Sequence, residues 1–364
     1  MKKFILFILG IFQLFACTIM EEKITPSVSK AEDNTIKQES PALLGTFLTQ
    51  KGPQSKWDDN TLREAFQRAK EAGIGVAIWT NDWGTIEPSL GNYNWELLDY
   101  VTAVTKQNGL KFSLSLEIAH ITDKANYPSE ILFTRFDDSV FLNSFKTFIR
   151  QFLKRYTGKI DYLFIGQEVD FYLHNQPKQK TPFLKFFQEV RNEIKSVAPN
   201  VITGVVGGYH LARETQETTL LQEFAKEGDV IALTLYMEDD NKNPNVIDTE
   251  KYFDELVALF PDKKIVIHET AWSSKGPKGS KQKQSDYIKE LAKVVRKYKS
   301  RIEFISWFIL YDFSQVDNVN AASAYGMDKY SQFLSWHGSL GLLNNDGTEK
   351  PAWHVWKEYM TKSE

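Results

Sequence analysis

The feature that most constrains the fold is a regular alternation of short apolar runs with longer amphipathic stretches, which repeats eight times along the chain. The runs are typical of buried strands and the stretches are typical of helices. Such alternation predicts a parallel sheet covered by helices. An open, doubly wound sheet has fewer strands and usually a Gly-rich phosphate turn after its first strand, and no such turn follows here. The sequence therefore predicts an α/β fold: a closed (β/α)8 TIM barrel in a single domain.

Glycine and proline breaks between the runs give the expected bounds of each element. The strands are expected at residues 43–49, 75–80, 111–117, 162–168, 201–206, 230–236, 264–269 and 302–308. The main helices are expected at residues 61–72, 95–107, 139–156, 182–198, 215–226, 249–260, 282–298 and 352–360. A barrel takes roughly 250 residues or more, so residues 43–364 accommodate one barrel domain with long loops.

The amino-terminal segment has the pattern of an export signal. Lysines precede an apolar run at residues 4–15, which is too short to span a bilayer as a stable helix. The motif Leu14-Phe-Ala-Cys17 resembles a bacterial lipobox. The resemblance implies a lipoprotein signal peptide at residues 1–16, cleavage before Cys17, and lipid attached to that residue. A plain secretory signal with a chance cysteine is the alternative. Cys17 is the single cysteine, so no intramolecular disulfide can form.

Residues 17–42 are mostly polar and charged, which predicts a lipid-anchored flexible tether between membrane and domain. The expected location is the bacterial cell envelope, at the outer membrane or cell surface in a Gram-negative organism. The net charge of −3 argues against a nucleic-acid partner, which would require a basic surplus or stripe. The expected state is a monomer that contacts the membrane through this anchor.

Two strands are expected to end in a glutamate, Glu168 after residues 162–167 and Glu269 after residues 264–268. A carboxylate at the end of a buried strand is costly to desolvate unless it has a partner or a function. The active site of such a barrel lies at the carboxyl ends of its strands, so the pair should share one site. Other candidates expected there are Trp79, Trp83, Glu117, His120, Gln167, His210, Tyr236, Trp272 and Trp307. Aromatic faces, carboxylates and amides together suit a carbohydrate.

The order of these residues resembles clan A glycoside hydrolases, which are retaining β-glycosidases on a (β/α)8 barrel. The shared pattern is a glutamate ending strands four and seven, a tyrosine ending strand six and a tryptophan in strand eight. The segment Gly341-Leu-Leu-Asn-Asn-Asp-Gly-Thr-Glu-Lys-Pro-Ala-Trp is similar to the loop before the last helix of many clan members. The resemblance implies that Glu168 is the general acid/base and Glu269 the nucleophile. It also implies that Tyr236 donates a hydrogen bond to the nucleophile and that Trp307 forms the floor of a sugar subsite.

The chain departs from the clan at Gln167, where clan members usually have asparagine. By the resemblance, the asparagine amide binds the 2-hydroxyl of the sugar. Glutamine carries the same amide one methylene further out, so Gln167 could make an equivalent contact or could be a structural amide.

The function expected from these residues is a retaining β-glycoside hydrolase that acts on a polysaccharide or oligosaccharide by a two-glutamate double displacement. Endo action on a β-glucan, β-mannan or β-galactan is favoured because loops after strands two and four and within residues 318–337 carry aromatic residues. The alternative is a catalytically inactive, glycan-binding lipoprotein on the same barrel. No cofactor is expected.

Each candidate also has a structural interpretation. Glu168 and Glu269 could belong to a set of structural ion pairs at the barrel rim. The four tryptophans could belong to the core. Glu117 and His120 have the spacing of a metal motif, but at a strand end a hydrogen-bonding subsite is favoured over a metal. His268 has the opposite strand parity to Glu269 and is expected to face the surrounding helices.

Overall fold

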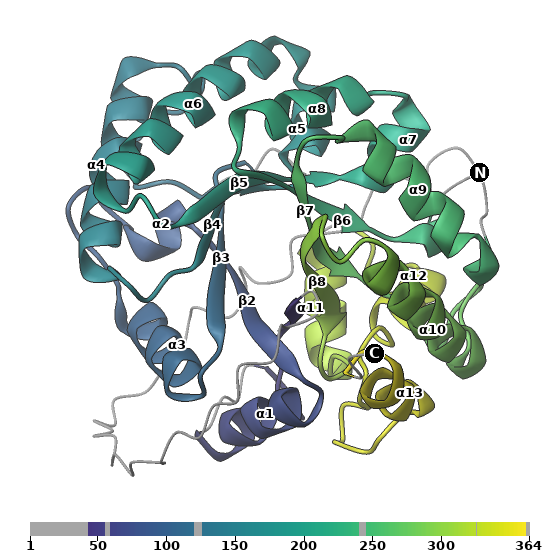
Figure 1. Cartoon of the computed structure of the whole chain (residues 1–364). Helices are drawn as coiled ribbons and strands as arrows, with labels where there is room; N and C mark the ends of the chain where they lie inside the picture. The colour runs from purple at the N-terminus through teal and green to yellow at the C-terminus, as the bar shows by residue number, and fades with distance from the viewer. Residues whose placement is uncertain (1–42, 55–58, 120–125, 240–244, 325, 362–364) are drawn as a thin grey trace.

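The computed structural model describes residues 43–54, 59–119, 126–239, 245–324 and 326–361. Its strands pair in parallel and in chain order, and β8 pairs with β1 to close the barrel (Figure 1). The predicted single (β/α)8 barrel is confirmed. The strands are β1 Leu43–Phe47, β2 Ile74–Asp82, β3 Lys111–Glu117, β4 Tyr162–Gln167, β5 Ile202–Gly208, β6 Val230–Leu235, β7 Lys264–Thr270 and β8 Ile302–Ile309.

A ring of amphipathic helices surrounds the strands (Figure 1). Each helix packs its apolar face against the barrel. Their starts follow local capping chemistry: Asp138 accepts the backbone amides of the first turn of α4, and Ser280 accepts an amide of α10. The bounds match the predicted helices to within a few residues. These helices are α1 Asp59–Glu71, α3 Glu96–Gln107, α4 Ser139–Arg155, α6 Lys180–Val197, α8 Thr218–Glu227, α9 Thr249–Leu259, α10 Lys281–Lys297 and α13 Pro351–Tyr359.

Further short helices occur in the loops that follow the strands, and the sequence did not predict them. Most span only one or two turns, too short to show a helical period. They are α2 Trp83–Ile86, α5 Val169–Asn175, η2 Pro177–Gln179, α7 Tyr209–Thr215, η3 Met237–Asp239, η4 Val246–Asp248, α11 Gln315–Ala324 and α12 Ser331–His337. All of them belong to the carboxyl-terminal end of the barrel, where they build the surroundings of the candidate site.

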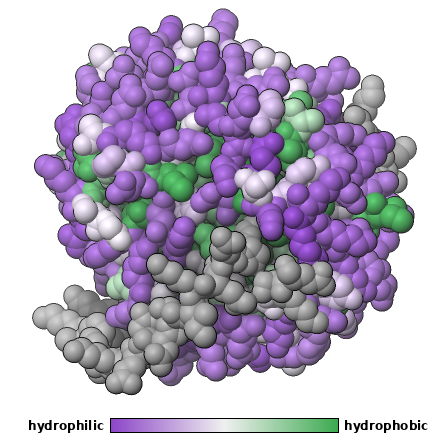
Figure 2. Space-filling view, viewed as in Figure 1, coloured by the Kyte–Doolittle hydropathy of each residue, from purple (hydrophilic) through white to green (hydrophobic). Residues whose placement is uncertain are grey.

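The core has two layers, one inside the barrel and one between the barrel and its helices. Each strand therefore has apolar neighbours on both faces, which explains why the strands read as nearly continuous apolar runs. The face of the molecule in Figure 2 is mostly hydrophilic, with hydrophobic residues in small scattered groups. Among the helices of the described residues, none combines the length and the apolar character needed to cross a bilayer.

The two strands that carry the predicted glutamates are both irregular just before them. On β4, Phe164 pairs with Gly204 and Gln167 with Val206, so three steps along β4 match two along β5. On β7, Ile267 pairs with Leu233 and Glu269 with Thr234, so two steps match one along β6. An extra residue of this kind is a β-bulge, which re-aims the side chains beside it.

Candidate active site

Glu168 lies one residue beyond β4 in the left-handed region, with φ of 50°. A non-glycine residue in this conformation costs roughly 1 kcal/mol or more, so surrounding contacts must hold it there. The hydroxyl of Thr234 on β6 donates to its Oε1, and its Oε2 has no partner among the described residues. Only 1% of Glu168 is exposed. Burial and then the charge of Glu269 raise the pKa of Glu168 well above its usual value, which favours the protonated acid.

Glu269 lies inside β7 and has a donor for each oxygen. The amide Nε2 of Gln167 lies 2.6 Å from Oε1, and the hydroxyl of Tyr236 lies 2.9 Å from Oε2. The hydrogen bond that the resemblance implied for Tyr236 is therefore present. An ionised carboxylate only accepts hydrogen bonds, so this arrangement suits a charged Glu269.

Glu117 ends β3 beside Asp82, its register partner at the end of β2. Ser115, two residues earlier, contacts His268 across the barrel, so Glu117 points into the same interior. Burial, followed by the charges of Asp82 and Glu269, raises the pKa of Glu117 to about 8. Asp82 also caps α2, because its Oδ1 accepts the backbone amide of the residue three positions on, at 2.6 Å.

Asp170 adds another buried carboxyl next to the end of β5. It accepts the backbone amide of Gly208 at 3.0 Å, and burial raises its pKa to about 7. Its Oδ2 has no partner among the described residues. The carboxyl ends of β2, β3, β4 and β7 thus place several acidic groups around one interior.

Polar atoms without partners gather in this same part of the barrel. A buried polar atom that makes no hydrogen bond costs about 1–3 kcal/mol, so such atoms mark places for water or a ligand. Within the described residues, those at the ends of β2 to β5 are Thr80 Oγ1, Glu117 Oε2, Gln167 Oε1, Glu168 Oε2 and Asp170 Oδ2. Gln167 Oε1 can only accept, whereas the hydroxyl and carboxyl oxygens can accept or, when protonated, donate. A ligand rich in hydroxyl groups would satisfy both kinds of atom.

Trp307 does not form the floor of this site, and that expectation was wrong. Its indole nitrogen donates to Leu340 O at 2.7 Å, and its ring lies 6.2 Å from Tyr287 of α10 and 5.8 Å from Trp356 of α13. The side chain therefore packs between barrel and helices. Because side chains alternate along a strand, its neighbour Phe308 faces inward instead, with its ring 6.0 Å from Tyr236.

Trp79, Trp83 and Trp272 are also buried core residues, so the structure contradicts their assignment as sugar platforms. Trp79 packs beside residues of α1 and α3 on the outer face of β2. Trp83 lies against the phenylalanines of α4, and its nitrogen donates to Glu87 at 2.6 Å. Trp272 packs on Tyr287 of α10 at 5.4 Å. In each case strand parity or loop direction turns the ring away from the strand-end carboxyls.

His268 was expected to face the helices, and the structure shows the opposite. Its Nε2 lies 3.2 Å from Ser115 Oγ, and its ring contacts Phe47 and Phe164 inside the barrel. The bulge in β7 is the physical reason, because the extra residue lets His268 and Glu269 both point inward.

Of the remaining candidates, His210 begins α7 and lies beside Tyr236, with ring centroids 6.2 Å apart. This contact brings it to the site that contains the glutamates. His120 and Cys17 lie outside the described residues. Within those residues, no group of three or more His, Cys, Asp or Glu side chains could hold a metal ion.

The loop after β8 supplies site residues that the sequence analysis did not identify singly. Trp336 of α12 donates from its indole nitrogen to Glu238 at 3.0 Å, and its ring lies 5.8 Å from Tyr236. Burial raises the pKa of Glu238 to about 7, and Ser273 also donates to it. The abundance of aromatics at residues 318–337 was the available signal, but it could not say which ring reaches Tyr236.

His337, next to Trp336, is stacked between Phe313 and Phe333 with ring centroids 5.1 and 5.3 Å away. Its Nδ1 lies 2.6 Å from Asn318 Oδ1, which makes Nδ1 the donor and leaves Nε2 as an acceptor. Nε2 has no partner among the described residues. Burial lowers the pKa of His337 to about 3, so the ring is neutral at physiological pH.

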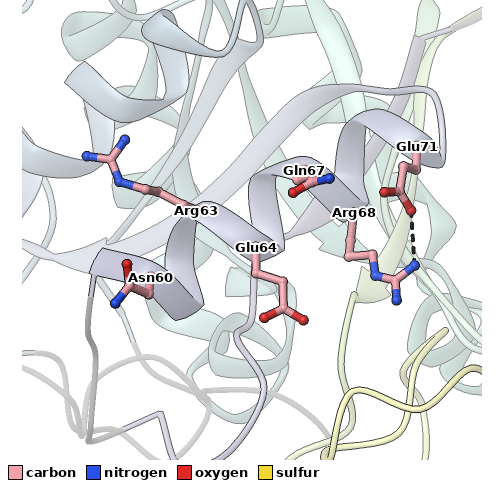
Figure 3. A pocket seen from close by; sticks show the side chains of 6 residues that line it. All are labelled: Asn60, Arg63, Glu64, Gln67, Arg68 and Glu71. Atoms are coloured by element: carbon pink, nitrogen blue, oxygen red, sulfur yellow. Dashed lines mark hydrogen bonds and ion pairs between the residues drawn. The ribbon is translucent and has the colours of Figure 1, made fainter. Parts of the chain in front are cut away.

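A surface depression on the outer face of α1 is a different place from this site (Figure 3). It is lined only by polar and charged side chains of one helix, including Arg68, which lies 3.0 Å from Glu71. Charged pairs spaced three or four residues apart are usual on a solvated helix face. None of the strand-end carboxyls lines it.

Comparisons with known proteins agree with the fold. The model of a β-galactosidase family matches residues 53–119. This segment ends just after β3 and contains neither Glu168 nor Glu269. A comparison with curated proteins finds no match. Among solved structures, a family 39 glycoside hydrolase from the gut symbiont Bacteroides cellulosilyticus WH2 is similar, with a TM-score of 0.61 and 14% identity. That similarity covers 87% of this chain and 63% of that one.

Two other barrels are similar at the same low identity. The exo-β-1,4-mannosidase Op5Man5 from Opitutaceae bacterium strain TAV5 has a TM-score of 0.67 and 13% identity, over 87% of this chain and 59% of that one. GH5_18 from Streptomyces cattleya, solved in complex with GlcNAc, has a TM-score of 0.66 and 14% identity, over 89% and 82%. The chain spans less than two thirds of the length of the first two proteins. It shares the barrel of these glycoside hydrolases.

Proposed function

We propose that this protein is a retaining β-glycoside hydrolase, with Glu168 as general acid/base and Glu269 as nucleophile. The observation that carries the proposal is that two buried, mutually interacting glutamates differ in their hydrogen bonds and in the protonation state that their surroundings favour. Glu269 receives two hydrogen bonds, whereas Glu168 receives one and is held toward its protonated form by burial and by the charge of Glu269. Two carboxyls in opposite protonation states are what a double displacement requires.

The first step breaks the bond between the anomeric carbon and the leaving oxygen. Glu269 attacks that carbon and forms a glycosyl ester, while Glu168 gives its proton to the leaving oxygen. Esterification removes the negative charge of Glu269, so the pKa of Glu168 falls and the group can act as a base. In the second step Glu168 takes a proton from water, the water oxygen bonds to the anomeric carbon and Glu269 is released. Two inversions give net retention.

Gln167 has a supporting role in this scheme. Its Nε2 is engaged by Glu269, so its Oε1, which has no partner among the described residues, is the atom available to a substrate hydroxyl. We therefore assign it both the orientation of the nucleophile and a contact with the sugar. Tyr236 fixes the other oxygen of Glu269, and Trp336 packs on Tyr236 from the loop after β8.

The proposed substrate is a β-linked polysaccharide, cleaved within the chain. Buried polar oxygens at the strand ends that have no partner among the described residues suit a polyhydroxylated ligand. Similar structures include an exo-β-1,4-mannosidase and GH5_18 proteins crystallised with Manβ1-4GlcNAc, which keeps a β-mannan among the candidates beside β-glucan and β-galactan. We also propose that Cys17 carries a lipid anchor that places a monomeric enzyme at the bacterial cell envelope.

The test is a reducing-sugar assay on a panel of β-glucans, β-mannans and β-galactans, with the anomeric configuration of the first product followed by proton NMR. Retention of configuration is expected, together with loss of turnover in Glu269→Ala. A product of inverted configuration would contradict the assignment of Glu269. Binding to a polysaccharide with no cleavage of any would favour the glycan-binding alternative.

A further inference from the structure

Resting on the proposed function, we propose that His268 is a positioning residue for the second half of the reaction. Its Nδ1–H faces Glu269 and stabilises the negative charge that returns to this carboxylate when the glycosyl ester is hydrolysed. The histidine does not touch the sugar and acts through the nucleophile. The inference stands on a polar layer inside the barrel, on the bulge in β7 and on the contacts of the two ring nitrogens.

The interior of the barrel holds polar side chains where such barrels normally hold bulky apolar ones. Ser113, Ser115 and Glu117 are spaced two residues apart on β3, so they share its inward face. His268 reaches this face from β7, with its Nε2 3.2 Å from Ser115 Oγ. All of these side chains are buried. Polar groups buried in this way cost stability unless they have a partner or a function.

The bulge in β7 is what brings His268 into this layer. In a regular strand consecutive residues face opposite sides, so His268 would point to the helices while Glu269 pointed inward. The extra residue just before Glu269 turns both side chains to the interior. The ring is held there in edge contacts with Phe47 and Phe164, whose centroids lie 5.6 and 5.4 Å away. Its two nitrogens therefore have fixed directions.

The acceptor that Nδ1 of His268 faces is the nucleophile. Nδ1 lies 3.7 Å from Glu269 Oε1 and has no hydrogen-bond partner among the described residues. This separation is too long for a hydrogen bond, so the contact acts through space. His268 is 0% exposed and Glu269 is 2% exposed, so little water screens the interaction. A fixed dipole is most effective on a nearby charge in such surroundings.

The contact with Ser115 indicates which nitrogen of His268 carries a hydrogen. If Nε2 accepts the hydroxyl hydrogen of Ser115, Nδ1 is the donor of a neutral ring. If the ring is protonated, both nitrogens donate. The remaining form has its hydrogen on Nε2 alone. That form would point the lone pair of Nδ1 at the carboxylate of Glu269 and would leave the Ser115 hydroxyl without an acceptor among the described residues. Nδ1 therefore carries a hydrogen.

The two steps of the reaction change the charge of Glu269 in opposite directions. In the first step the carboxylate gives an electron pair to the anomeric carbon, so a group that stabilises its charge does not speed this step. In the second step a water oxygen bonds to that carbon, the water proton passes to Glu168, and the electron pair of the ester bond returns to Glu269. The N–H of His268 stabilises this returning charge beside the donors Gln167 and Tyr236.

The experiment measures the two steps separately on the full chain. The probes are the 2,4-dinitrophenyl 2-deoxy-2-fluoro β-glycosides of glucose, mannose and galactose, which complete the first step and leave a long-lived glycosyl ester. Intact-protein mass spectrometry follows the formation of the ester and, after the probe is removed, its hydrolysis. Peptide mapping locates the ester, which is expected on Glu269.

His268→Leu and His268→Asn are a matched pair of variants. Both remove the ring and leave side chains of similar volume, but the amide of His268→Asn keeps a donor near the position of Nδ1. We expect His268→Leu to slow ester hydrolysis about tenfold and ester formation less than about threefold. We expect His268→Asn to hydrolyse the ester within about threefold of the wild-type rate. Equal slowing of both steps by His268→Leu, or equal hydrolysis in the two variants, would overturn the inference.

Ser115→Ala keeps the ring of His268 and removes the hydroxyl that favours a hydrogen on Nδ1. We expect it to slow ester hydrolysis about threefold and to leave ester formation unchanged. If neither variant of His268 folds, this variant decides, and unchanged hydrolysis then overturns the inference. The control is His354→Leu, which breaks an exposed pair whose Nε2 lies 3.2 Å from Glu349 Oε2. It should leave both rate constants unchanged.

The same measurements separate failure of the inference from failure of the proposed function. A wild-type protein that forms no ester on Glu269 with any of the three probes would overturn the proposed function, and the inference with it. An ester on Glu269 that His268→Leu hydrolyses at the wild-type rate would overturn the inference alone and leave the glycosidase assignment intact.

Discussion

The ends of β4 and β7 are built alike but treat their glutamates differently. Both strands carry a bulge just before the glutamate, and both carboxyls are buried. Glu269 stays within its strand and accepts two hydrogen bonds, from Gln167 and Tyr236. Glu168 lies beyond its strand, has Thr234 as its one donor among the described residues, and keeps one oxygen unpartnered. Burial therefore does not distinguish the two carboxyls, whereas the number of hydrogen-bond donors does.

The difference between the two glutamates also depends on a contact between the two strand ends. Gln167, the residue that precedes Glu168, donates a hydrogen bond from its side-chain amide to Glu269 rather than to Glu168. The β4 bulge makes this possible because it re-aims Gln167 toward the interior, while the left-handed backbone of Glu168 sets the direction of the next side chain. The end of β4 thus supplies a hydrogen-bond donor to Glu269 while leaving its own carboxyl, that of Glu168, with one oxygen unpartnered among the described residues.

The largest expected effect comes from removing the better-supported carboxylate. Glu269→Ala should lower kcat on an aryl β-glycoside by at least about 10⁴-fold, because no covalent intermediate can form. Added azide should restore turnover and give a glycosyl azide of inverted configuration, detected by NMR. Glu64→Ala on the surface of α1 is the control and should retain full activity. Substantial azide-independent turnover by Glu269→Ala would break the comparison.

Replacing the proposed proton donor, Glu168, should have a smaller effect that depends on the substrate. Glu168→Gln should slow glycosylation by about 10²–10⁴-fold with a poor leaving group, and much less with an activated aryl group that needs no proton. Steady-state rates across a series of aryl leaving groups would show this dependence. Near-wild-type turnover of a polysaccharide would exclude the acid role.

Weakening the support of Glu269 should have an intermediate effect. Tyr236→Phe removes a hydrogen bond to a charged group, worth about 1.5–3 kcal/mol, so kcat/KM should fall by roughly 10–100-fold. Tyr287→Phe is a matched control, because that hydroxyl bonds to Thr270 on the outer side of β7. The control should change thermal stability but alter kcat/KM only a few-fold. Equal kinetic losses in the two variants would mean that Tyr236 acts through the fold alone.

The smallest expected effect is a shift in pH dependence rather than a loss of rate. The Thr234 hydroxyl lowers the pKa of Glu168, so Thr234→Val should raise that pKa further. Because Glu168 must be protonated for the first step, the alkaline limb of kcat/KM should move to higher pH. Thr234→Ser keeps the hydroxyl and should keep the wild-type profile. A shift to lower pH in Thr234→Val would contradict the role of this hydrogen bond.

Strand parity explains which site predictions failed. Trp79 and Trp307 were assigned to the site because they lie near strand ends, but alternate residues of a strand face opposite sides and these two face the helices. His268 was predicted to face the helices but faces the interior, since the β7 bulge cancels the alternation on which the prediction depended. A bulge depends on the neighbouring strand, so it leaves no dependable signal in a single segment.

The loop after β8 shows a second limit. Trp336 contacts Tyr236 and Glu238, which precede it by about a hundred residues, and nothing in the local pattern pairs them. The richness in aromatics of residues 318–337 indicated a role at the rim but gave no direction for any ring. Loop direction depends on contacts between separate segments, such as the one between Lys350 and Asp312.

By itself the sequence determined the barrel and located Glu168 and Glu269 near the ends of the fourth and seventh strands. It could do so because burial on both faces of a strand and the period of a helix are local constraints, written in consecutive residues. The tertiary structure alone decided which side chains meet at Glu269, which tryptophans belong to the core, and how many donors each glutamate receives. Those outcomes depend on register between neighbouring strands and on contacts between distant loops, which are properties of the assembled barrel.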